Sequence, residues 1–256
     1  VYTITVTDNN LCNQSANVTV TQPPATSFTW DGSESTSWND ENNWTPSGIP
    51  SAGVEIIIPD VTNQPILDVN SSIGNLTIES NSSIDLSSFS LTITEHISNQ
   101  GGSIIYNTGT VNMSGTQAQT ITGTNELYNL IIDNSNGVSV SSGSLSIINE
   151  LTLLNGPFTT NNAVTLISTS TNTARIAEVI SGTITGHVIC QRYLAGEGGW
   201  RILGSPVTDA SIENWDEDFI TSGFPGSDAP SFGFSSIYSY DEETPGGYDE
   251  GYKIPT

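Results

Sequence analysis

The most constraining feature of this chain is an internal repeat. Residues Asn75 to Gly102 read NLTIESNSSIDLSSFSLTITEHISNQGG, and residues Asn129 to Gly156 read NLIIDNSNGVSVSSGSLSIINELTLLNG, at a constant offset of 54 without a gap. Nine of the 28 aligned positions are identical, and nearly all apolar positions coincide. A unit of this size can bury its apolar side only by stacking on a neighbour, so the repeat indicates a continuous core shared by stacked units.

Within each copy the apolar residues form short alternating pairs separated by Ser, Asn and Gly. The first copy contains three such pairs: Leu76 with Ile78, Ile84 with Leu86, and Leu91 with Ile93. Alternation with a period of two indicates strands, and the small polar residues between them indicate turns. The pattern predicts a right-handed parallel β-helix.

The repeat also predicts which side chains form the core. We expect Leu76, Ile78, Leu130 and Ile132 to point inward, and the two copies to lie on one rod with parallel strands. An offset of 54 is not a whole number of coils of roughly 20 residues. We therefore expect an insertion or an extra strand in one coil.

Composition supports an all-β fold. Apolar residues make up 35% of the 256 residues and charged residues only 12%, while Ser, Thr, Asn and Gly are abundant. No window shows a sustained apolar stripe with a period of 3.6 residues. The sequence therefore predicts strands with little or no helix.

The charge of the chain excludes some classes of partner. Its formal net charge is −23, from 27 acidic residues against four basic ones. Such a surface repels nucleic acid and anionic lipid, so we expect neither as a partner. No run of 18 apolar residues predicts a membrane span, and Val1 does not begin a signal peptide. We expect the chain to be a segment of a longer protein.

Residues 1–22 predict a β-hairpin, with alternation over Tyr2 to Thr7 and again over Ala16 to Thr21. The stretches YTITVTDNNLC and VTVTQPP resemble the last two strands of the Ig-like repeats in very large bacterial surface adhesins. In that family the hairpin cysteine pairs with one earlier in the same repeat, which implies that Cys12 has its partner outside this chain. A free thiol is the alternative. We expect Cys190 to pack as a small apolar residue.

Residues 23–53 predict a linker and an aromatic cap. Pro23 and Pro24 end the hairpin, and three of the five tryptophans follow, Trp30, Trp38 and Trp44. Their layout resembles the entry module of secreted bacterial β-helix proteins, in which large aromatic side chains close the first coil. A solenoid end exposes unpaired backbone and core, so it needs a cover. The alternative is that these three tryptophans are weak glycan-binding candidates.

Residues 54–190 predict the β-helix itself and carry no catalytic pattern. Polysaccharide lyases and hydrolases need a base beside clustered carboxylates, or a close pair of acids. Between Val54 and Ile189 the only cation is Arg175, and the carboxylates are scattered singly. His96 and His187 are far apart in sequence, and we expect both at the surface or at coil corners. We expect no catalytic residue and no enzymatic activity.

Residues 191–256 predict a junction and the start of a further β module. Arg192, Tyr193, Trp200 and Arg201, together with the SPV at 205–207, resemble a junction that follows the solenoid in cell-surface proteins exported by the type IX secretion system. We expect Arg192, Trp200 and Arg201 to be structural, with buried arginine–carboxylate pairs closing the last coil. A ligand site is the alternative. No final strand is evident in the last 16 residues.

Three acidic stretches are weak candidates for a metal site. Asp216 with Asp218, and Asp241 with Glu243, are the places where so negative a surface gathers acids. The loop of Asp40 to Asn43 is also rich in oxygen atoms and could hold calcium, but a solvated turn explains it better. We expect no cofactor, with calcium as the open alternative.

Together these observations predict a non-enzymatic stalk or adhesive segment of a large secreted or cell-surface bacterial protein. The resemblance implies an extracellular location, extracellular glycans or surface proteins as targets, and the secretion machinery of the parent protein as a partner. The alternative is a β-helix protein that binds or cleaves polysaccharides.

Overall fold

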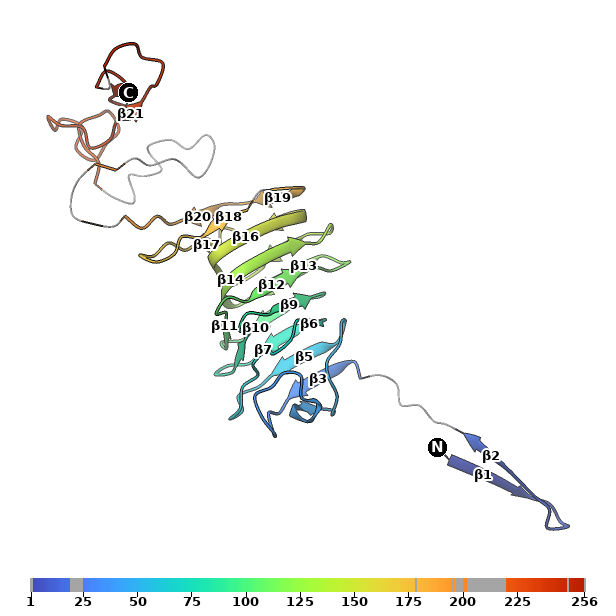
Figure 1. The fold of residues 1–256 in the computed structure, drawn as a ribbon. Coiled ribbons are helices and arrows are strands. Elements are labelled where there is room, and N and C mark those ends of the chain that lie inside the picture. Colours follow the sequence, from blue (N-terminus) through green and yellow to red (C-terminus); the bar gives the residue numbers. More distant parts are fainter. Residues whose placement is uncertain are drawn as a thin grey trace. The chain divides into compact units, whose positions relative to one another are not determined.

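The computed structural model describes residues 2–18, 25–177, 179–194, 196, 200–201, 220–247 and 249–255 (Figure 1). The chain divides into two compact units, Val1–Gly196 and Glu197–Thr256. In the described residues the regular structure is strand, apart from the 3₁₀ turn η1 (Glu41–Asn43). No helix in this part of the chain is long and apolar enough to cross a membrane. The all-β prediction is confirmed.

The first unit contains a parallel β-helix with three faces, numbered here in the order in which the chain passes through them. The first face stacks β3 (Ser27–Trp30), β5 (Glu55–Ile58), β7 (Leu76–Ile78), β10 (Ile97–Asn99), β13 (Gln119–Thr122), β15 (Val138–Val140), the end of β16 (Ser144–Thr159) and β19 (Gly182–Thr185). The second face comprises β8 (Ser83–Asp85), β11 (Ser103–Ile105), the beginnings of β14 (Thr124–Asp133) and β16, β17 (Val164–Leu166) and β20 (Val188–Cys190). The third face stacks β6 (Ser71–Ile73), β9 (Ser90–Ile93), β12 (Thr110–Met113), the end of β14, the middle of β16, and β18 (Arg175–Ile176).

Strand register along the first face gives the length of each coil. Phe28 pairs with Ile56, Ile56 with Leu76, and later Phe158 with Ile184, all between parallel strands. The eight stacked strands make seven coils of 19 to 28 residues. At about 4.8 Å per stacked strand, seven coils rise by about 34 Å. The predicted parallel β-helix is confirmed, and its stack begins at β3, earlier than the predicted boundary at residue 54.

The 54-residue offset moves each position two faces onward along the chain. Leu76 lies on the first face, whereas its counterpart Leu130 lies in the part of β14 that belongs to the third face. In the same way Leu91 lies on the third face and its counterpart Leu145 on the second. The offset therefore spans two coils and two further faces, and no inserted strand is needed to explain it. The two copies lie on one rod with parallel strands, as predicted.

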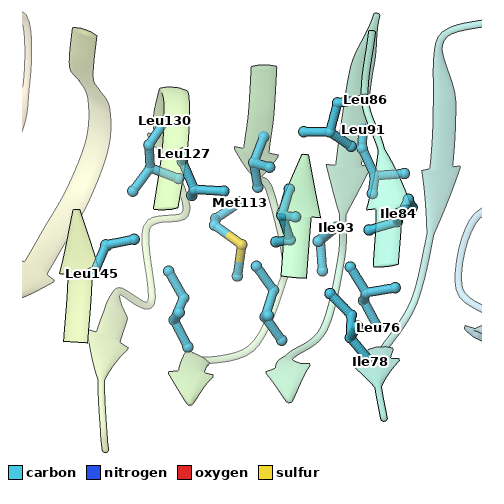
Figure 2. Packing of buried hydrophobic residues seen from close by; sticks show 14 of the residues in the cluster. Leu76, Ile78, Ile84, Leu86, Leu91, Ile93, Met113, Leu127, Leu130 and Leu145 are labelled. Carbon is cyan, nitrogen blue, oxygen red and sulfur yellow. The ribbon is translucent and has the colours of Figure 1, made fainter. Parts of the chain in front are cut away.

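Apolar side chains from all three faces fill the interior (Figure 2). Leu76, Ile78, Leu130 and Ile132 are fully buried, which confirms their predicted inward direction. The core residues also stack in register, so that Ile93 of β9 lies beside Met113 of β12. Burying each such side chain contributes about 1.5–3 kcal/mol, and the register lets every coil contribute to the same core.

Small polar residues and glycines form the corners between faces. Asn81, Asn107 and Asn161 have φ angles of 62°, 41° and 49°, in the left-handed region that Asn tolerates better than most residues. Gly123 and Gly143 occupy one corner of successive coils with φ angles of 80° and 79°. A Cβ at Gly143 would overlap the carbonyl group of Gly123, so this corner needs glycine for space as well as for conformation.

The predicted hairpin is present, with a shifted second strand. β1 (Tyr2–Thr7) pairs antiparallel with β2 (Asn13–Val18), and Thr7 lies opposite Asn13. Asp8 closes the turn, because its Oδ1 accepts hydrogen bonds from the backbone N–H groups of Asn10 and Cys12. This tight turn starts β2 three residues before the predicted position. Residues 19–24 lie outside the described part of the chain.

The second unit contains a short antiparallel pair, β21 (Ser239–Tyr240) and β22 (Tyr252–Lys253). A final strand therefore exists where the sequence predicted none, although it is only two residues long. The aromatic ring of Tyr252 contacts those of Tyr240 and Tyr238, with centroid separations of 5.0 and 6.3 Å. Aromatic contacts accompany the strand pair, and strands of two residues are too short to show alternation in the sequence.

Candidate functional site

The three predicted cap tryptophans lie inside the molecule. Trp30, Trp38 and Trp44 are at most 1% exposed, and Trp44 meets the other two edge-to-face at centroid distances of 4.9 and 4.7 Å. The indole Nε1 of Trp44 donates to the carbonyl oxygen of Trp38, and that of Trp30 donates to the carbonyl oxygen of Asn63. A sugar can stack only on an open ring face, so these residues cannot form the glycan platform that was the alternative. The glycan-binding alternative for these three tryptophans is therefore wrong.

The 3₁₀ turn η1 accounts for the oxygen-rich loop beside the tryptophans. The carboxylate of Asp40 accepts hydrogen bonds from the backbone and side-chain nitrogens of Asn42. Asn43 is fully buried, and its Oδ1 accepts hydrogen bonds from the backbone N–H groups of Glu34 and Ser35. The oxygen atoms of this loop therefore hold the cap together.

The candidate metal residues do not form a described site. Asp216 and Asp218 lie outside the described residues. Asp241 accepts hydrogen bonds from the Oγ1 of Thr244 and the backbone N–H of Glu243, so it stabilises its own turn, and these bonds lower its pKa. In the part of the chain that the structure describes, no three His, Cys, Asp or Glu side chains come together as metal ligands would.

The junction residues are exposed, which contradicts the expectation of buried arginine pairs. Arg192 and Arg201 are exposed, and their Nη1 atoms donate to the carbonyl oxygens of Gln191 and Trp200. Trp200 is 62% exposed and contacts the ring of Phe234 at 5.6 Å. The ion pair that the structure does describe lies earlier, between Arg175 and Glu150 on neighbouring coils. An exposed guanidinium keeps its hydration, so its place at the surface has little energetic cost.

Several solenoid acids form braces between successive coils. Asp85 accepts a hydrogen bond from Asn107 Nδ2 one coil further on, at 2.7 Å. In the same way Asp68 accepts a hydrogen bond from Ser37, and Glu95 accepts one from Asn75. These carboxylates therefore have structural roles on the outside of the rod.

The two histidines and Cys190 lie where the sequence placed them. Both histidines are exposed, and the Nδ1 of His96 accepts a hydrogen bond from the backbone N–H of Thr120 at 3.0 Å. Cys190 is a free thiol, partly buried against the core, and this burial raises its pKa. A raised thiol pKa disfavours the nucleophilic thiolate, which fits a packing role.

A groove runs along the corner between the second and third faces. Two tyrosines from successive coils form its aromatic part: Tyr106, which follows β11, and Tyr128 in β14. Their rings are nearly parallel, with centroids 6.4 Å apart and an interplanar angle of 18°. Ile148 and Ile167 continue this column on the next two coils, and the cavity has a volume of about 560 Å³. That volume lies within the range of small-ligand pockets.

An inserted loop in the last coil forms the polar wall of this groove. Thr169, Thr171 and Asn172 line the cavity together with the carboxylate-bearing Glu126. The loop is held in place because the Nδ2 of Asn172 donates to the carbonyl oxygen of Ile148 at 2.6 Å. Its ends are joined by a hydrogen bond of 2.7 Å between the hydroxyls of Ser168 and Thr173. The groove thus has a rigid apolar floor and polar groups at its edge.

The side chain of Glu126 differs from the bracing acids. It is exposed, and among the residues that the structure describes it makes no hydrogen bond or ion pair, so its carboxylate faces the groove unengaged. A carboxylate of this kind accepts hydrogen bonds from hydroxyl or amine groups of a ligand.

Comparison with known proteins yields one match. A family model described as a domain of unknown function (DUF8693) matches residues 29–114, about a third of the chain, from within β3 to just beyond β12. No curated protein and no solved structure matches the chain. The matched stretch contains the aromatic cap and Tyr106, whereas the other groove residues lie beyond it.

Sequence reasoning missed the groove, although one signal for it exists. Both tyrosines are followed by asparagine, in YN dipeptides that lie 22 residues apart, close to the length of one coil. A search for aromatic residues at coil spacing outside the inward positions would have found them. The contribution of the loop at 168–173 could not be found in this way, because it depends on the fold of a longer coil.

Proposed function

We propose that this chain is a non-enzymatic stalk or adhesive segment of a large secreted or cell-surface bacterial protein. The observation that carries the proposal is the use of the outward acids as braces between coils. Asp68, Asp85, Glu95 and Glu150 each contact a side chain of a neighbouring coil. A rod whose polar groups tie one coil to the next is suited to bear load and to hold attached parts at a distance.

The chemistry of polysaccharide cleavage supports the same proposal by contrast. A hydrolase places two carboxyl groups about 5 to 10 Å apart across the scissile bond, and a lyase needs a base beside the sugar. The larger groove contains a single ionisable acid, Glu126, between two tyrosines. The smaller cavity, of about 330 Å³, contains Glu95 and His96, and both side chains accept hydrogen bonds within the corner. Neither cavity is lined by the pair of carboxyl groups that a hydrolase uses.

The remaining parts of the proposal rest on the sequence resemblance. The hairpin of residues 1–22 is proposed to end an Ig-like repeat, and residues 191–256 to begin a module of a protein exported by type IX secretion. An extracellular location and targets among extracellular glycans or surface proteins follow from the same resemblance. The second candidate function, polysaccharide binding without cleavage, is favoured by the groove at Tyr106 and Tyr128.

A turnover assay tests the absence of enzymatic activity. The purified chain is incubated with neutral and acidic polysaccharides, with and without calcium, and reducing ends and unsaturated products are measured. We expect no product above a heat-denatured control. Product that disappears in a Glu126→Gln or Glu95→Gln variant would overturn the proposal. A melting temperature that does not change with calcium or a chelator would remove calcium as a ligand.

Surface exposure tests the proposed location. Intact cells that make the parent protein are labelled with an antibody raised against this chain, before and after treatment with an external protease. We expect labelling that the protease removes. Labelling that requires permeabilised cells would contradict an extracellular location.

A further inference from the structure

We propose that the groove at the corner between the second and third faces binds a neutral sugar chain, with Tyr106 and Tyr128 as the stacking platform. The inference deepens the adhesive role proposed above, on which it rests, by naming the class of ligand and the place where it binds. It also moves the expected sugar contact from the buried tryptophans of the cap to two tyrosines in the middle of the rod.

The two rings have the properties that sugar stacking needs. A ring face carries negative charge density, so it attracts the positively polarised C–H groups on one side of a pyranose ring. Both tyrosines are half-buried and line the cavity, which leaves part of each ring accessible. The two rings come from successive coils and are stacked, at 18° between their planes, so together they form the aromatic part of the groove.

The strands hold the platform in position before any ligand arrives. Tyr128 lies in β14 between the buried side chains of Leu127 and Leu130, at a shift in the register with β16. Its neighbours Leu127 and Asn129 are paired on either side of this shift. The loop wall is fixed by the Asn172 bond to Ile148. A preformed site loses little conformational entropy when it binds, which favours a weakly interacting ligand such as a sugar.

The polar groups at the edge match hydroxyl-bearing ligands. The Glu126 carboxylate accepts hydrogen bonds from hydroxyl groups, and the hydroxyl of Thr171 both donates and accepts. The hydroxyl of Thr169 shapes the wall instead, because it bonds to the backbone of Thr171 and Asn172. A groove with a few placed polar groups around an apolar floor is the usual form of a small-ligand site. Sugars are the ligands that present hydroxyls at their rim and C–H groups on their face.

Charge excludes acidic sugars from the groove. No Lys, Arg or His is among the residues that line the groove, and its one ionisable acid is Glu126. The whole chain carries a net charge of −23. Uronic-acid and sulfated chains would therefore be repelled both by the groove and by the surrounding surface.

Binding to a panel of oligosaccharides tests the proposal. The full chain is titrated with neutral cello-, xylo-, manno- and galacto-oligosaccharides and with acidic oligogalacturonates, by calorimetry or by NMR. We expect at least one neutral oligosaccharide to bind and the acidic ones not to bind. In a Tyr128→Ala variant we expect the affinity to fall about tenfold or more, because the platform loses a ring.

Two further variants separate stacking from folding. Tyr128→Phe keeps the ring and should keep the affinity within about twofold, while a Phe232→Ala control in the second unit, where the side chain is 63% exposed, should bind as the original chain does. If Tyr128→Ala does not fold, hydrogen exchange provides the test instead. The bound oligosaccharide should protect the 168–173 loop from exchange, and Glu126→Gln should lose this protection.

Several outcomes would overturn the proposal. The first is that no neutral oligosaccharide binds at millimolar concentration. The second is that acidic chains bind more strongly than neutral ones, and the third is that Tyr128→Ala leaves the affinity unchanged. The same mixtures are assayed for reducing ends, which separates the two proposals. Product formation would refute the non-enzymatic role, whereas an absence of both product and binding would refute only the groove.

Discussion

The two ends of the β-helix are finished in different ways. At the first coil, β4 (Trp44–Thr45) pairs antiparallel with β3 and covers its outer edge, and three fully buried tryptophans close the core. At the last coil, β19 and β20 each pair with one strand among the described residues, and Ile189 is 58% exposed. An uncovered strand edge offers backbone groups to other chains, so a cap is valuable at any end that no other module covers.

This difference indicates where the stability of the rod is concentrated. In a solenoid each coil contacts only its neighbours, so a terminal coil is held from one side and unfolds first unless a cap supports it. The first coil has such support in its aromatic cluster, whereas the last coil has a half-buried Ile184 in its place. We therefore expect the first coils to be more stable than the last, and the following predictions test this.

The largest effect is expected from Trp44→Ala. Removing a buried aromatic side chain costs about 3–5 kcal/mol, because the cavity cannot collapse fully. Trp44 also contacts Phe28 edge-to-face at 6.3 Å and donates to the carbonyl of Trp38. We expect lower stability in denaturant and faster hydrogen exchange in β3 and β5. Trp44→Phe, which keeps a ring but loses the hydrogen bond, should lie between. Equal exchange in all three proteins would contradict a capping role.

The next prediction compares a central coil with the last one. Leu130→Ala removes a fully buried side chain and should cost about 2–5 kcal/mol. Ile184→Ala removes a partly buried side chain that packs at the margin of the core, so we expect a smaller loss, of about 1 kcal/mol. Both are measured by urea unfolding followed by circular dichroism. A loss at Ile184 as large as that at Leu130 would mean that the last coil is fully packed.

The sequence predicted the core of the rod well because inward positions obey a simple rule. Alternation over three residues places two side chains on one side of a strand, and Leu76, Ile78, Leu130 and Ile132 follow it. What alternation does not contain is the face to which each strand belongs. The corners vary in length, so the 54-residue offset looked like two whole coils plus an insertion when it is two coils and two faces.

The candidate site was less accessible to sequence reasoning for a related reason. The three cap tryptophans were evident because tryptophan is rare and these three are clustered. A tryptophan that closes a core and one that stacks on a sugar have the same sequence pattern, so the sequence alone did not distinguish the two roles. Tyr106, Tyr128 and Asn172 meet only because coils of different lengths bring them to one corner. Such a meeting depends on the stacking register, which no short window of sequence specifies.

A smaller effect is expected at the glycine corner, where a matched control exists. Gly143 and Gly53 have nearly equal φ angles of 79° and 81°, so alanine has about the same conformational cost at both, about 1–2 kcal/mol. A Cβ at Gly143 would overlap Gly123, whereas one at Gly53 would meet nothing. We expect Gly143→Ala to lower Tm more than Gly53→Ala. Equal shifts would mean that the corner can relax and that conformation alone selects glycine there.

The smallest predicted effect is a pH dependence at the capped end. Asp31 accepts a hydrogen bond from Thr45 Oγ1 at 2.6 Å and others from Ser33, and the bond from Thr45 is the main reason that its pKa lies below the ordinary value. The native state therefore binds fewer protons here than the unfolded state does. The resulting stability is fully present above the unfolded pKa, near 4, and is lost as the pH falls through the lowered folded value.

This dependence can be isolated from that of the many other acids by comparing variants. Asp31→Asn should reduce the loss of Tm between about pH 5 and pH 2, whereas Asp60→Asn, which removes the same charge from an exposed position, should follow the original chain. Protonation of the other acidic residues also relieves self-repulsion, and this contribution is nearly the same in all three proteins. The difference between the Asp31 and Asp60 variants therefore reports the bond that joins Asp31 to β4. If the two variants titrate alike, the strand that covers the first coil does not depend on this carboxylate, and the stability of that end comes from its tryptophans alone.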